Sequence, residues 1–272
     1  MGIILGIQFE ATEDGQVVAS DTSDGSLWAN IGIRLSAVSQ LLSGGGLAGS
    51  TTDNPPYLFC VPDPNNDNNP YTVATVFAGK FTQGGHLHFW ISALKGWIFD
   101  SNGATTLCGK ISLYAATTKR STASEIDTVK TNTFDRFTWL CPRAFTPLVG
   151  NDGTTKATSA PHSAPLLSTA VAYDSYPSAG TRIGLDTLAL ISSTLYHELF
   201  HLTDAAQTTA DPYTKMDDIY EAGGEFHASN VANNPESYVL FALASYIYSN
   251  PPTGSPDKVA VVFPGGFSKT ID

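Results

Sequence analysis

The sequence feature that most constrains this chain is the stretch His197-Glu198-Leu199-Phe200-His201, in which two histidines stand four residues apart. On an α-helix, residues four apart project from one face about one turn apart, so two imidazole nitrogens can bind a single Zn²⁺. A carboxylate directly after the first histidine can reach a water molecule that such an ion makes easier to deprotonate. The pattern therefore predicts a zinc site with Glu198 as general base.

Apolar residues around the two histidines have the spacing of a helix with one buried face. They are Leu188, Ile191, Leu195, Leu199 and Leu202. Asp186 is a residue type that caps helix starts, so we expect a helix from about residue 186 to residue 204. The alternative is a buried helix whose two histidines bind nothing, and the rarity of the full pattern favours the zinc site.

The composition indicates a folded globular chain that is poor in basic residues. Of its 272 residues, 42% are hydrophobic and 14% are charged, and the net charge is −11. A chain without a basic stripe cannot release phosphate counterions, which argues against a nucleic-acid partner. An acidic surface attracts cationic substrates, so we expect polypeptide substrates, with a preference for basic ones. We expect the protein to be a monomer.

The sequence gives no sign of a membrane partner. No apolar run is long enough to span a bilayer, and the opening residues lack the basic flank of a signal peptide. The three cysteines, Cys60, Cys108 and Cys141, allow one disulfide and leave one thiol.

Short apolar pieces separated by polar residues predict strands near the start of the chain, at residues 2–9, 16–19 and 31–42, with a break at Gly44-Gly45-Gly46. We expect residues 1–70 to form an N-terminal extension, containing β-structure, that is either separate or part of one domain with residues 71–272. Aromatic residues indicate core between residues 71 and 115, and a further strand should end at Pro142. His86 and His88 would share one face of a strand, but no carboxylate or thiol accompanies them, which favours ordinary histidines over a second metal site.

A third zinc ligand is expected after the histidine helix, because catalytic zinc sites use three protein ligands and leave one position for water. Five residues fall within reach of a chain that turns back: Asp217, Asp218, Glu221, Glu225 and His227. A final helix is predicted by Asn234 as cap and Pro235 at its first position, with Glu236 facing the helix dipole.

Three patterns occur in order along the chain: His197-Glu198-x-x-His201, Thr214-x-x-Asp217-x-x-Tyr220 and Asn234-x-x-Ser237-Tyr238-x-x-Phe241-Ala242. Together they resemble the aspzincin metallopeptidases, the deuterolysin and peptidyl-Lys metalloendopeptidase group, over roughly residues 135 to 245. The resemblance implies an α+β, zincin-like fold and a secreted zinc endopeptidase. It implies a Zn²⁺ ion held by His197, His201 and Asp217, with Glu198 as general base and Tyr220 as donor to the oxyanion.

Two residues depart from the pattern of that group. Tyr213 and Glu221 stand where it has glycines, so both side chains would alter one wall of the substrate cleft. By spacing alone, Glu221, Glu225 or Glu236 could replace Asp217 as ligand; Asp217 is favoured because the pattern brings Tyr220 with it. A zinc-holding binding module and a hydrolase of non-peptide amides are the alternatives to a peptidase.

Overall fold

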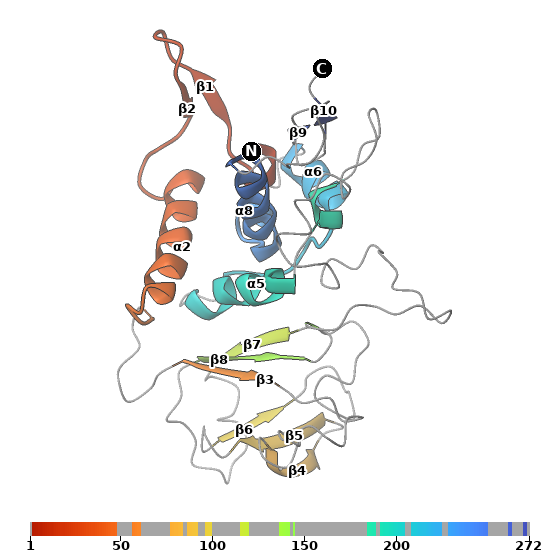
Figure 1. Ribbon diagram of the computed structural model, residues 1–272. Helices are drawn as coiled ribbons and strands as arrows, with labels where there is room; N and C mark the ends of the chain where they lie inside the picture. Colours follow the sequence, from red (N-terminus) through yellow and green to blue (C-terminus); the bar gives the residue numbers. More distant parts are fainter. Residues whose placement is uncertain are drawn as a thin grey trace, which may run out of the picture. The chain divides into compact units, whose positions relative to one another are not determined.

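The computed structural model describes residues 2–47, 56–60, 77–83, 86–91, 96–99, 115–119, 136–141, 144, 184–188, 191–204, 208–224, 228–249, 261–262 and 269–270. The elements divide into two compact units, Met1–Ser39 together with Pro147–Asp272, and Gln40–Thr146 (Figure 1). Helices dominate the first unit and strands the second. The chain is therefore a mixture of α and β structure, and its zincin-like arrangement stays a prediction.

The two units do not follow the predicted division at residue 70, because the start of the chain is buried in the helical unit. Helix α1 (Gly2–Leu5) contributes Ile4, which is 0% exposed, and Leu5, which is 3% exposed. Ile4 packs in one core cluster with Leu240 and Ile247 of α8 (Pro235–Ser249). Helix α1 is thus part of the core of the helical unit.

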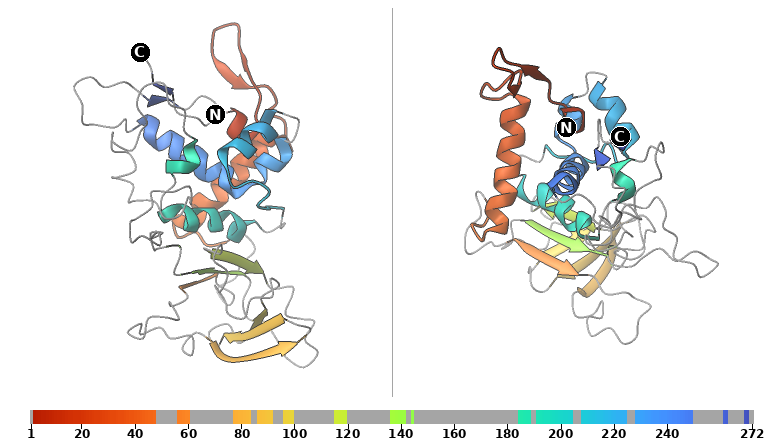
Figure 2. Two further views of the ribbon diagram at one scale, coloured as in Figure 1. Left: turned by 90° about the vertical axis from the view of Figure 1, so that its right-hand side faces the viewer. Right: turned by 45° about the horizontal axis from the view of Figure 1, so that its top comes forward.

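The helical unit is arranged around α8, which lies between α2 (Leu27–Leu42) and α6 (Met216–Gly224) in Figure 1 and in the right-hand view of Figure 2. Helix α5 (Ile191–Thr203) packs against α8, and the short helix α7 (Ala228–Ala232) precedes it. Helix α8 starts at Pro235, the predicted first position, and ends at Ser249. The predicted cap by the Asn234 side chain is wrong, because its buried Oδ1 accepts no hydrogen bond from the residues that the structure describes. Strands β9 (Val261–Val262) and β10 (Lys269–Thr270) form an antiparallel pair.

The prediction of strands near the start is correct only for a hairpin, β1 (Phe9–Ala11) with β2 (Val17–Ala19). Residues 31–42 belong instead to α2, because Ile31 and Val38 are spaced by two helical turns and both are buried. The Ser26 hydroxyl accepts a hydrogen bond from the Ala29 N–H at 3.2 Å and caps the start.

The predicted break at the glycines is confirmed as the end of α2. Gly44 has φ 82°, a left-handed conformation that glycine adopts without steric cost. The Gly44 and Gly45 N–H groups donate to the carbonyls of Leu41 and Gln40, at 3.0 and 2.8 Å. These two hydrogen bonds satisfy carbonyls that the helix end would otherwise leave unpaired.

The helix that carries the histidines is shorter than predicted. Residues 185–188 form a 3₁₀ turn, η5 (Leu185–Leu188), and α5 begins at Ile191. Asp186 therefore does not cap α5. Its carboxylate accepts a hydrogen bond from the backbone of Met216, at the start of α6. Burial raises the pKa of the Asp186 carboxyl, and the nearby charges of Asp217 and Glu236 add to that shift.

The second unit holds two three-stranded sheets. One has the order β3-β8-β7, with β3 (Tyr57–Cys60) parallel and β7 (Ala115–Lys119) antiparallel to β8 (Arg136–Leu140). The other is an antiparallel meander of β4 (Phe77–Gln83), β5 (His86–Ile91) and β6 (Gly96–Phe99). Strand β8 confirms the strand predicted before Pro142, and the adjacent Cys141 is disulfide-bonded, in keeping with the single bridge expected.

In the portion of the chain that the structure describes, no helix combines the length and the apolar character needed to cross a bilayer.

Replacement of Ile4 by alanine should lower the free energy of unfolding by about 2–4 kcal/mol, because it empties a fully buried site. The matched control is Ile33→Ala on α2, where the side chain is 66% exposed and little burial is lost. Urea unfolding of both variants measures the difference. Equal stability of the two variants would show that the N-terminal helix does not belong to the core.

Candidate metal centre

The two histidines of α5 present their rings side by side. Their ring centroids are 5.2 Å apart, as expected for residues one turn apart on a helix. Both side chains are mostly buried, with 14% of His197 and 16% of His201 exposed. The structure thus confirms that His197 and His201 share one face of a helix.

The Nδ1 atom of His197 is held by a buried carboxylate from another helix. It lies 3.1 Å from Oε2 of Glu236, whose side chain is 3% exposed in the first turn of α8. Because a carboxylate only accepts, Nδ1 must carry the proton and donate it to Glu236. This leaves Nε2 as the atom of His197 that can bind a cation.

The Nδ1 atom of His201 is likewise a hydrogen-bond donor, in this case to a hydroxyl. It lies 3.0 Å from Oγ1 of Thr209, and that hydroxyl donates its own proton to Oδ2 of Asp204 at 3.0 Å. The hydroxyl oxygen is therefore an acceptor toward His201, so Nδ1 again carries the proton. Nε2 of His201 is likewise left to bind a cation.

Asp204, at the end of α5, holds residues 208–211, which we call the turn and in which Thr209 lies against His201. Its Oδ2 accepts hydrogen bonds from the backbone N–H groups of Thr208 and Thr209, at 2.6 and 2.7 Å. Burial alone would raise the pKa of this carboxyl, but these donors and the charge of Arg34 lower it. The Asp204 carboxylate therefore stays ionised and continues to accept these hydrogen bonds.

Arg34 of α2 stabilises the same turn by hydrogen bonds and an ion pair. Its NH2 group donates to Oγ1 of Thr208 at 2.8 Å and to Oδ1 of Asn233 at 2.7 Å, and NH1 lies 3.8 Å from Asp204. Asn233 lies just before α8, which carries Glu236, and its carbonyl accepts from the Ala210 N–H at 3.2 Å. The two segments that hold the histidine Nδ1 atoms are thus tied together.

The turn delivers Asp211 to both histidines at once. Oδ1 of Asp211 lies 3.0 Å from Nε2 of His197 and 3.0 Å from Nε2 of His201. The three ligand atoms all lie within 4.8 Å of one another, and Asp211 is 49% exposed, so solvent reaches the group. We call these three residues the candidate centre.

The candidate centre fits Zn²⁺ in ligand type, number and spacing. Two imidazole nitrogens and one carboxylate oxygen are common zinc ligands, and three protein ligands are typical of catalytic sites. Ligand atoms around a tetrahedral zinc lie roughly 3.3 Å apart, close to the two 3.0 Å separations. The two fixed Nδ1 atoms supply the outer hydrogen bonds that orient histidine ligands in metal sites.

The charges around the centre favour a cation. Burial lowers the pKa of His197, but the hydrogen bonds to Asp211 and Glu236 and the charges of Glu236 and Glu198 outweigh it and raise the pKa to about 10. Burial raises the pKa of the Asp211 carboxyl, but the hydrogen bonds to both histidines outweigh it and bring that pKa well below the usual range. Without a metal, the group holds a proton on His197 where a divalent ion would bind.

Glu198 directly follows His197 on α5 and is buried, with 6% of its surface exposed. Its charge contributes to the raised pKa of His197, so the carboxylate lies near the centre. It is not among the three residues whose ligand atoms converge. This position, beside the ligands but separate from them, suits a base better than a ligand.

The structure places Asp211, and not Asp217, beside the two histidines. Asp217 is exposed in the first turn of α6, whose neighbouring residues Met216 and Ile219 are fully buried in the core. Burial of those two residues turns Asp217 toward solvent. Asp211 follows His201 by ten residues and directly precedes Pro212, close enough in sequence to be a ligand, whereas the aspzincin pattern indicates Asp217.

None of the remaining predicted site residues is a member of the candidate centre. Tyr220 is 40% exposed on α6, and Glu221 is exposed beside it. Tyr213 packs against the core cluster that contains Met216. Glu236 is not one of the three converging residues and holds His197 instead. Glu225, His227 and the side chains of His86 and His88 lie outside what the structure describes.

No protein-family model matches the chain, and neither a curated protein nor a solved structure matches it.

Asp211→Asn should reduce the affinity for zinc by at least about 100-fold, because it removes a ligand rather than an outer partner. Asp217→Asn is the matched control and should bind zinc as the parent does, since its side chain is exposed on α6. Competition with a chromophoric chelator measures both. Zinc loss in Asp217→Asn with retention in Asp211→Asn would favour the ligand that the aspzincin resemblance implies.

Zinc affinity should rise by about tenfold per pH unit between pH 7 and pH 9, and level off above pH 10. The reason is that zinc must displace the proton on His197, whose pKa is raised to about 10 in the metal-free protein. Titration calorimetry in buffers with different ionisation heats should show about one proton released from His197 per zinc at pH 8. Affinity that is constant over this range would contradict the proton held by His197.

Proposed function

We propose that this protein is a zinc-dependent endopeptidase in which His197, His201 and Asp211 hold the ion and Glu198 is the general base. The observation that carries the proposal is the convergence of both Nε2 atoms on one Asp211 oxygen while both Nδ1 atoms are engaged by other residues. When bound, zinc polarises the carbonyl of the scissile bond and makes a water molecule easier to deprotonate.

The residues of the chain have separate tasks in this reaction. Glu198 takes the proton of the attacking water and later delivers it to the leaving amine. Glu236 and Thr209 hold Nδ1 of His197 and His201, so that both Nε2 atoms are directed to the position of the ion. A role for Tyr220 as donor to the oxyanion rests on the aspzincin resemblance alone, because its side chain is 40% exposed on α6.

The substrate proposed is a polypeptide. The net charge of −11 favours encounter with basic chains at low ionic strength, an effect that salt should screen. A secreted location is suggested by the resemblance alone.

Glu198→Gln should keep its zinc and lose about 10²- to 10⁴-fold in peptide cleavage, because the amide cannot take a proton. The matched control is Glu13→Gln, at an exposed position between β1 and β2, which should cleave as the parent does. Elemental analysis and cleavage of casein give the two readings. A Glu198→Gln protein that cleaves at the parental rate would exclude this mechanism.

Parallel assays of peptide binding, peptide cleavage and hydrolysis of small amides separate the alternatives. A zinc-loaded parent that binds peptides without cleaving them would be a binding module, and one that hydrolyses only small amides would be a different hydrolase.

A further inference from the structure

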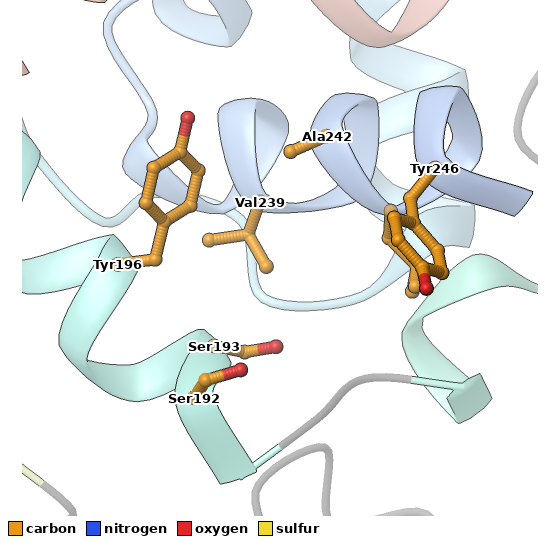
Figure 3. A pocket seen from close by; sticks show the side chains of 7 residues that line it. Ser192, Ser193, Tyr196, Val239, Ala242 and Tyr246 are labelled. Carbon is orange, nitrogen blue, oxygen red and sulfur yellow. The ribbon is translucent and has the colours of Figure 1, made fainter. Parts of the chain in front are cut away.

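A cavity of about 310 Å³ lies between α5 and α8, in the size range of pockets that bind small ligands (Figure 3). Side chains from both helices line it, as Figure 3 shows for Ser192, Ser193, Tyr196, Val239, Ala242 and Tyr246. Leu243 completes the lining. Every lining residue belongs to the helical unit.

The lining selects for apolar groups. No residue that lines the cavity carries a charge, and its polar groups are hydroxyls of serine and tyrosine. A charged side chain placed there would lose its hydration without gaining an ionic partner, which is unfavourable. An aliphatic or aromatic side chain would gain by leaving water.

The cavity adjoins the candidate centre along both helices. Ser193 precedes His197 by four residues on α5, which is about 6 Å along the axis. Val239 follows Glu236 by three residues on α8, about 4.5 Å along the axis. The 3.1 Å contact between His197 and Glu236 fixes the two helices together at this point, so the cavity begins about one turn away.

We propose that this cavity binds an apolar side chain of the polypeptide substrate, such as leucine or phenylalanine, one or two residues from the bond that is cleaved. An extended peptide advances about 3.3–3.6 Å per residue, so one or two residues span the separation along the helices. The proposal rests on the peptidase function proposed above and adds its specificity. Charge attracts basic chains at long range, whereas the cavity selects a residue at the site.

The first test is a binding measurement that needs no turnover. Full-length Glu198→Gln protein loaded with zinc is titrated with N-acetyl-phenylalaninamide and with N-acetyl-lysinamide, and ligand-observed NMR gives both Kd values. We expect the phenylalanine amide to bind at least about tenfold more tightly. Equal binding of the two amides would overturn the proposal.

Variants locate the binding in the cavity. Ala242→Phe should fill it from α8 and weaken binding of the phenylalanine amide by about tenfold or more. Ser192→Phe fills it from α5 at an exposed position, so its folding is less at risk. Ser249→Phe adds the same ring to an exposed site of α8 outside the cavity and should bind as the parent does. Unchanged binding in folded Ala242→Phe and Ser192→Phe proteins would overturn the proposal.

Cleavage then separates this proposal from the function it rests on. The parent is incubated with a peptide mixture, and mass spectrometry identifies the cleaved bonds. We expect apolar residues to be enriched within two positions of those bonds, and Ser192→Phe to lose that enrichment. Cleavage without enrichment would overturn the cavity proposal and leave the peptidase function standing. Selective amide binding by a parent that cleaves no peptide would overturn the peptidase function and the assignment of the cavity to a substrate.

Discussion

The carboxylate of Asp204 is the group on which the candidate centre depends. A helix can place two histidines on one face, but it cannot supply an acceptor opposite them. Asp204 does this indirectly, by accepting from two backbone N–H groups and a hydroxyl of the following turn, so that Thr209 reaches His201 and Asp211 reaches both rings. These are hydrogen bonds to a charged, mostly buried acceptor, which are among the stronger ones in proteins.

The centre is also defined by an excess of negative charge. Three carboxylates, those of Asp211, Glu236 and Glu198, act on His197, and Asp211 also acts on His201. Arg34 offsets Asp204 on the far side of the turn and is not among the groups that shift His197. Carboxylates gathered at low exposure repel one another unless a cation or protons neutralise them. These carboxylates hold a proton on His197. A divalent ion would likewise relieve the repulsion between them.

Packing between α5 and α8 serves both the centre and the cavity. Phe200 stacks on Tyr238 with ring centroids 4.3 Å apart, and the Tyr238 hydroxyl donates to the carbonyl of Ala232 at 2.7 Å. This buried contact keeps Glu236 beside His197 and leaves an apolar space one turn further along. Leu5 from α1 and Ile31 from α2 belong to the same cluster, so the start of the chain supports the site without contributing a ligand.

Local patterns in the sequence determined the parts of this protein that local geometry controls. The spacing of His197 and His201 dictated a shared helical face, the glycines after Leu42 ended α2, and Pro235 started α8, because each depends only on neighbouring residues. The third member of the centre, the partner of each Nδ1 and the helical state of residues 31–42 were decided by tertiary structure. Asp211 and Asp217 carry the same carboxylate, and both follow the histidine helix closely in sequence. Only the turn held by Asp204, and the burial of Met216 and Ile219, places one carboxylate at the histidines and the other in solvent.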